Sequence, residues 1–80
     1  MENLDVKRRI AMTGIKRGEF AAMIDAEAQK STGYHVTLPD LSAAYNCKGR
    51  PTEKQRWIIE TALVLLRKIE SGEIDLNGRE

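Results

Sequence analysis

Side chains that carry enzyme or metal chemistry are scarce in this sequence. Cys47 is the one cysteine and His35 the one histidine among 80 residues, so neither an internal disulfide nor a structural zinc site can form. The sequence holds no nucleophile with a nearby base, no paired carboxylates and no glycine-rich phosphate loop. We therefore expect no enzyme activity, no metal, no cofactor and no small-molecule substrate.

Basic residues are the remaining candidates for chemistry, because they can bind phosphate groups. Residues 1–56 hold ten Lys and Arg against seven Asp and Glu, a net charge of +3. Residues 57–80 hold three against five, a net charge of −2. The chain can therefore present a basic face although its net charge is only +1, which slightly favours a nucleic acid as partner.

The elements that must position these residues are helices. Apolar periodicity predicts four of them and no sheet. Thr37 with Asp40, and Thr52 with Gln55, have the spacing of capping boxes that start the third and fourth helices. The predicted helices run from Asp5 to Thr13, from 19 to 30, from Leu38 to Asn46 and from Glu53 to Glu70.

The predicted fold class is an all-α four-helix domain with a long C-terminal helix. It covers residues 1–72, and residues 73–80 form a loose tail. Each helix has a core-facing group of apolar residues. These are Val6, Ile10 and Ala11 in the first helix, Phe20, Ala21, Ile24 and Ala28 in the second, and Ile58, Ile59, Ala62, Leu63, Leu65, Leu66 and Ile69 in the fourth.

Trp57 and Val64 lie off the apolar arc of the fourth helix. Seven residues separate them, so they share one side of that helix. Two interpretations are open. Either Trp57 packs against the first helix or the tail, or Trp57 and Val64 form the contact between two copies of the chain.

Two segments resemble one family of DNA-binding domains. In Ile15 to Ile24 an apolar residue precedes a polar pair, and Phe20 and Ala21 stand where a leucine-like residue and a small contact residue are expected. Ser42 to Pro51 follows the order Ser, variable, apolar, Glu, Asn, Gly, basic, basic, variable, Pro, with Tyr45 in place of Glu. The sequence is thereby similar to the phage repressor and Cro type, or XRE-like, helix-turn-helix family over about residues 5–66.

The match has departures besides Tyr45. Cys47 replaces glycine and Gly49 replaces a basic residue. Ala21 and Ser42 lie 21 positions apart, well beyond a compact helix-turn-helix. We assign the extra length to the segment Asp25 to Val36, and expect it to add about 1.5 turns to the second helix and a loop after it.

The resemblance implies roles for individual residues. Basic residues at the start of the second helix contact phosphate, residues of the third helix face the major groove, and basic residues after it grip the DNA backbone. Asn46 can bond an adenine edge, whereas an alanine can only touch a thymine methyl group. The phosphate contacts are Lys16, Arg17, Lys48, Arg50 and Lys54, and the groove-facing residues are Pro39, Ser42, Ala43 and Asn46.

The function that this implies is a sequence-specific regulator of transcription. We expect it to be encoded by a phage or mobile element, and to bind a palindromic site on double-stranded DNA as a homodimer. The alternative is a protein-interaction module on the same scaffold, such as an antirepressor or a phage packaging component. The charged N-terminal segment and the short apolar runs predict a soluble cytoplasmic protein without membrane contact.

Each of these residues also has a plainer interpretation. Lys16 and Arg17 can be an ordinary solvated helix start, and Ser42 a buried serine that bonds a backbone carbonyl. Tyr34 and Tyr45 are expected to pack rather than to stack on bases, and Cys47 to be inert.

Overall fold

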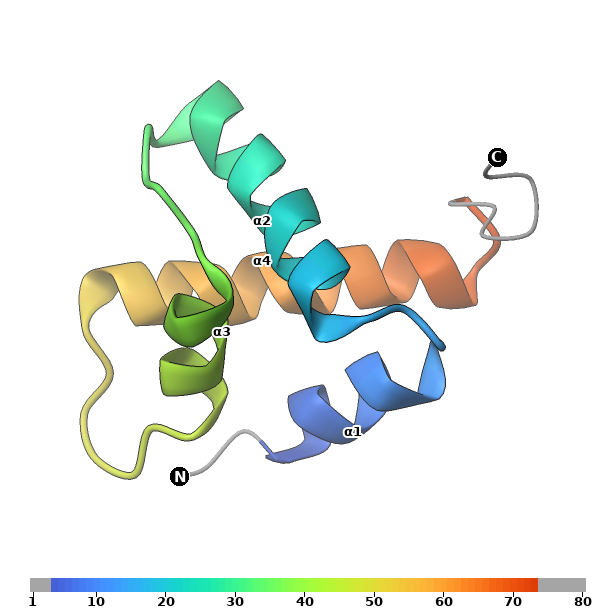
Figure 1. Cartoon of the computed structure of the whole chain (residues 1–80), viewed down its shortest axis with the longest axis horizontal. Helices are drawn as coiled ribbons and strands as arrows, with labels where there is room; N and C mark the ends of the chain where they lie inside the picture. Colours follow the sequence, from blue (N-terminus) through green and yellow to red (C-terminus); the bar gives the residue numbers. More distant parts are fainter. Residues whose placement is uncertain (1–3, 74–80) are drawn as a thin grey trace.

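The computed structural model describes residues 4–73 of the chain. Within them the fold is all-α, with helices α1 (Leu4–Met12), α2 (Arg17–Ser31), α3 (Leu38–Tyr45) and α4 (Glu53–Glu70) and no strand. The long helix α4 crosses behind α2 and α3 in Figure 1 and packs against each of the other three helices. The predicted fold class is confirmed, and each predicted helix is present within two residues of its expected bounds. Residues 74–80 of the predicted tail lie outside the described residues.

Both predicted capping boxes are present. The Thr37 hydroxyl accepts from the backbone N–H of Asp40, and the Asp40 carboxylate accepts from the N–H of Thr37. Thr52 and Gln55 make the same reciprocal pair at the start of α4, at 2.9 and 3.1 Å. These bonds satisfy N–H groups that have no partner inside the helix, and therefore fix where α3 and α4 begin.

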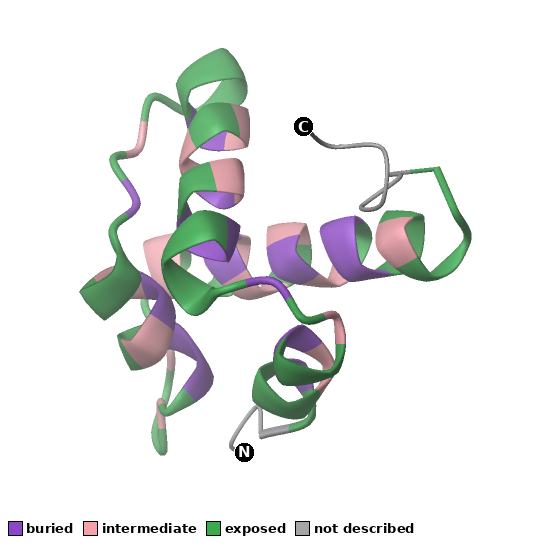
Figure 2. Cartoon of the chain, turned by 45° about the vertical axis from the view of Figure 1, so that its right-hand side comes forward, coloured by how far each residue is buried: buried purple, intermediate pink, exposed green. Residues whose placement is uncertain are grey.

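The core forms where the four helices face each other, which Figure 2 shows as purple turns on their inner sides. The predicted stripe of α2 and the predicted arc of α4 are confirmed, since their members are buried or packed against the core. Val6 and Ile10 are buried too, but Ala11 is exposed and its assignment was wrong. Ala11 follows Ile10 by one residue, about 100° around the helix, which turns it away from the core.

The segment 25–36 divides between α2 and a loop, as expected. Helix α2 continues to Ser31, and residues 32–37 connect it to α3. The loop is fastened to α2, because the N–H of Val36 donates to Asp25 Oδ1 at 2.8 Å and Gln29 Nε2 donates to the Tyr34 carbonyl at 2.8 Å. Val36 itself is buried in the core.

The two ends of the domain meet at an ion pair. Arg9 of α1 donates twice from Nη2 and once from Nε to the carboxylate of Glu70 at the end of α4, at 2.9 to 3.1 Å. None of the helices described between residues 4 and 73 has the length and apolar character needed to cross a membrane.

Candidate nucleic-acid interface

Three helices meet at the side chain of Tyr45. The residue is only 1% exposed, yet its hydroxyl accepts from Arg17 Nη1 at 3.2 Å and lies 3.3 Å from the hydroxyl of Ser42. The ammonium group of Lys7 lies 5.8 Å from the centre of the Tyr45 ring, within reach of a cation–π interaction. Tyr45 therefore joins α1, the start of α2 and α3 at one place.

The charges around Tyr45 change its acidity. Burial raises the pKa of the Tyr45 hydroxyl, but the hydrogen bonds with Ser42 and Arg17 and the positive charges of Arg17 and Lys7 outweigh burial. The pKa of Tyr45 therefore lies below its ordinary value of 10.0. The positive charges of Arg17 and Lys7 thus lie close together where the three helices meet.

The start of α2 carries positive charge at the surface. Lys16 occupies the N-cap position with an extended backbone, and its side chain makes no capping bond. Lys16 and Arg17 are both exposed. Their charges add to the partial positive charge that the helix dipole places at an N-terminus.

Helix α3 presents one side to solvent. Leu41, Ala44 and Tyr45 are buried on the inner side. Of the four residues predicted to face a groove, three are exposed and Ser42 is half-buried. Asn46 follows the last helical residue as the C-cap, and its N–H donates to the Ser42 carbonyl at 3.0 Å. The exposed three are Pro39, Ala43 and Asn46.

The basic residues that follow α3 differ in their surroundings. Lys48 and Arg50 are exposed in the connection between α3 and α4. Lys54 instead lies 3.5 Å from the carboxylate of Asp40 and already has an anionic partner. The backbone and side-chain bonds of Thr37 and the charge of Lys54 lower the pKa of Asp40 below 3.8 against the opposing effect of burial, so the Asp40 carboxylate is ionised at neutral pH.

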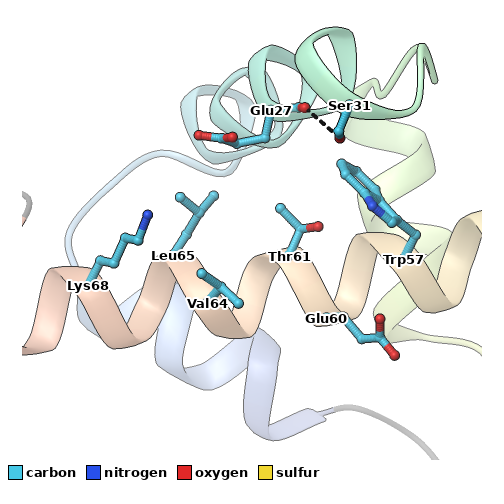
Figure 3. A pocket seen from close by; sticks show the side chains of 8 residues that line it. All are labelled: Glu27, Ser31, Trp57, Glu60, Thr61, Val64, Leu65 and Lys68. Atoms are coloured by element: carbon cyan, nitrogen blue, oxygen red, sulfur yellow. Dashed lines mark hydrogen bonds between the residues drawn. The ribbon is translucent and has the colours of Figure 1, made fainter.

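Trp57 and Val64 line a groove of about 350 Å³ between α2 and α4 (Figure 3). Trp57 is half-buried and packs edge-on against Tyr34 of the loop, with ring centres 5.7 Å apart. The loop before α3 is thus a packing partner of Trp57 that the sequence did not predict, and residues 74–80 of the tail lie outside the described residues. Val64 is 44% exposed. Tyr34 and Tyr45 both pack, as expected.

Sequence reasoning missed Tyr45 as a site residue and missed Lys7 altogether. One signal was present, because Ser42 and Tyr45 are three residues apart and so share a side of α3. Arg17 lies 28 residues before Tyr45, and no local pattern predicts a contact at that separation. The plainer interpretation of Ser42 also changes, since its hydroxyl bonds the Tyr45 hydroxyl rather than a backbone carbonyl.

No group of three or more His, Cys, Asp and Glu side chains gathers as a metal ion requires within residues 4–73. His35 is exposed and lies 3.4 Å from Asp25. Comparisons with protein-family models, with curated proteins and with solved structures found no match.

Proposed function

We propose that this protein is a sequence-specific regulator that binds double-stranded DNA, with α3 against the major groove and the start of α2 on the phosphate backbone. One observation carries the proposal. The bonds of the Tyr45 hydroxyl to Arg17 and Ser42 hold the basic start of α2 at the C-terminal turn of α3, whose other side faces solvent. Helix-turn-helix domains need these two surfaces side by side, because one helix contacts the backbone while the other enters the groove.

The phosphate contacts in this proposal come from three places. Lys16 and Arg17 stand at the start of α2, and Lys48 and Arg50 follow α3. Arg17 spends one N–H on Tyr45, and a guanidinium has five, so four can still serve a phosphate. Lys54 contributes less to phosphate binding, because its ammonium group is already paired with the carboxylate of Asp40.

The base contacts in this proposal are few. Pro39 and Ala43 offer only apolar contact, and Ser42 shares its hydroxyl with Tyr45. Asn46 is the one amide at this surface, and it stands at the C-terminal end of α3. One domain therefore discriminates sequences weakly, and two copies on a palindrome, with recognition helices about 34 Å apart, supply the rest.

The test compares two variants that lose the same charge in different places. Lys16→Ala removes a proposed phosphate contact, and Lys30→Ala removes an exposed lysine at the other end of α2. Duplex affinity is measured over a series of salt concentrations. We expect Lys16→Ala to weaken binding and to reduce the salt slope by about one unit, because one phosphate contact is lost. Lys30→Ala should leave both unchanged.

Two paired variants decide the proposal. Lys16→Ala/Arg17→Ala and Lys48→Ala/Arg50→Ala each remove two proposed contacts, so each should lower duplex affinity for every sequence tested. If both leave the affinity of the wild type unchanged, the DNA-binding proposal is wrong. Selection from a random duplex library then identifies the site, and a recovered palindrome supports binding by two copies.

A further inference from the structure

The solvent-exposed side of α4 carries charges that would pair with those of a second, antiparallel copy of the same helix. Glu60, Val64 and Lys68 follow one another at four-residue steps, so they form one row along the helix. Val64 is 44% exposed, and Glu60 and Lys68 are exposed on either side of it. An acidic and a basic residue thus stand four positions before and four positions after an exposed apolar residue.

The surface around this row is hollowed. The groove between α2 and α4 includes Glu60, Val64 and Lys68 in its lining (Figure 3). A second hollow, of about 290 Å³, continues past Val64 and Lys68 to Ser71. Val64 therefore lies where two hollows join, with room for the ridge of another helix.

We infer that this row is the contact between two copies of the chain, with their α4 helices antiparallel about a two-fold axis at Val64. Residues equally far before and after Val64 then meet across the axis. Val64 packs against Val64 of the partner subunit, and Glu60 pairs with Lys68 of the partner subunit. The symmetry repeats the ion pair, so the dimer has two. The inference rests on the proposed function for its purpose, which is to place two recognition helices, but not for its geometry.

The charges nearest the axis favour this register over the neighbouring one. An axis midway between Trp57 and Val64 brings Trp57 against Val64 of the partner subunit, and Glu53 opposite Lys68 of the partner subunit. It also sets Glu60 beside its own copy at the axis, a contact between like charges, which disfavours an interface. Trp57 accordingly lies toward the edge of the contact, packed on Tyr34.

The experiment is sedimentation equilibrium on the full chain without DNA, over a wide concentration range. The wild type should approach twice the chain mass of 9.0 kDa. Val64→Glu should remain monomeric, because it sets two carboxylates together at the axis. Met12→Glu is the matched control, since Met12 is an apolar residue of α1 that is 84% exposed, and this variant should dimerise like the wild type.

Charge reversal tests the register. Glu60→Lys alone and Lys68→Glu alone each place like charges across the axis, so each should lose the dimer. The double variant Glu60→Lys/Lys68→Glu restores both pairs and should dimerise again. Circular dichroism of each variant checks that the helices remain, because all three positions are exposed and none contributes to the buried core.

Three results overturn the inference. They are a wild type that stays monomeric at every concentration, a Val64→Glu variant that still dimerises, and a double reversal that fails to restore what the single reversals lose. If the wild type is monomeric, the partner that fits the groove between α2 and α4 is a different protein and not a second copy of this chain. The mass is measured without DNA, so the two proposals can fail separately. A wild type that is monomeric but still binds duplex DNA contradicts the dimer contact and leaves the DNA-binding proposal standing. A dimer with no duplex affinity removes the DNA proposal instead.

Discussion

At Tyr45 a single ring has both a structural and an electrostatic role. Its aromatic face is buried in the core, whereas its hydroxyl holds the guanidinium of Arg17. A tyrosine makes this polar link to the start of α2 without a full negative charge, so the positive potential near the proposed phosphate contacts is preserved.

Tyr45→Phe isolates the role of the hydroxyl. The ring and its contact with Lys7 remain, and only the bonds to Arg17 and Ser42 are lost, so we expect about 1 kcal/mol less stability at neutral pH. The duplex affinity of Tyr45→Phe should fall by less than that of Arg17→Ala. In Tyr45→Phe the guanidinium of Arg17 keeps its charge but is no longer held in place by the Tyr45 hydroxyl. In the double variant the Tyr45→Phe effect on affinity should vanish. Simple addition of the two effects contradicts the positioning role.

The difference in stability between the wild type and Tyr45→Phe, measured over a range of pH, reports the ionisation of Tyr45. Its pKa is lower in the folded chain than its ordinary value of 10.0, so the unfolded chain binds more protons as the pH approaches 10.0. The stability of the wild type relative to Tyr45→Phe should therefore increase as the pH rises through the folded pKa.

At the scale of the helix, local sequence rules predict where elements begin and end. The two capping boxes and the helix bounds follow from residues at most four positions apart, which is the range over which helical hydrogen bonds act. The same rules fail for contacts between elements. The pairing of Lys54 with Asp40 spans 14 residues and depends on how α3 packs against α4. For this reason the sequence predicts that Lys16 and Ala43 are exposed, which the structure shows, but it does not predict that Arg17 bonds Tyr45, because packing between helices sets that contact.

The capping box at the start of α3 should make the stability of the protein depend on pH through Asp40. Its carboxylate caps α3 and holds Lys54, and its pKa is lowered below 3.8 in the folded chain. Its contribution to stability is therefore complete above that ordinary pKa and is lost as the pH falls through the lower folded one. Asp40→Ala should cost about 1 kcal/mol at neutral pH and less in acid.

Chemical denaturation followed by circular dichroism at neutral and acidic pH measures the Asp40→Ala difference. Thr37→Ala removes the other half of the same capping box, so its effect and that of Asp40→Ala should not add. A loss of the same size at both pH values contradicts the account of the carboxylate.

At the scale of the whole molecule, stability rests on a small core. A chain of 80 residues is expected to have a total stability of about 4–8 kcal/mol. Phe20 is fully buried between helices, and removing such a ring costs about 3–5 kcal/mol. We expect Phe20→Ala to consume most of the stability, so that thermal unfolding followed by circular dichroism begins near room temperature.

Met12→Ala is the control for Phe20→Ala. Because Met12 is exposed, the Met12→Ala variant should unfold at the same temperature as the wild type. A Phe20→Ala variant that melts with the wild type contradicts the expectation that one core holds all four helices together. The exposed pair of Arg9 and Glu70 cannot compensate for such a loss, since surface ion pairs contribute at most about 1 kcal/mol.

The packing of Trp57 on Tyr34 has an optical consequence. Trp57 is the one tryptophan of the chain, and it stands between the loop that precedes α3 and the groove that Val64 shares. Its fluorescence therefore reads two events without an added dye. Release of the loop exposes the indole to water and shifts its emission to the red, whereas a helix settling into the groove shields it and shifts the emission to the blue.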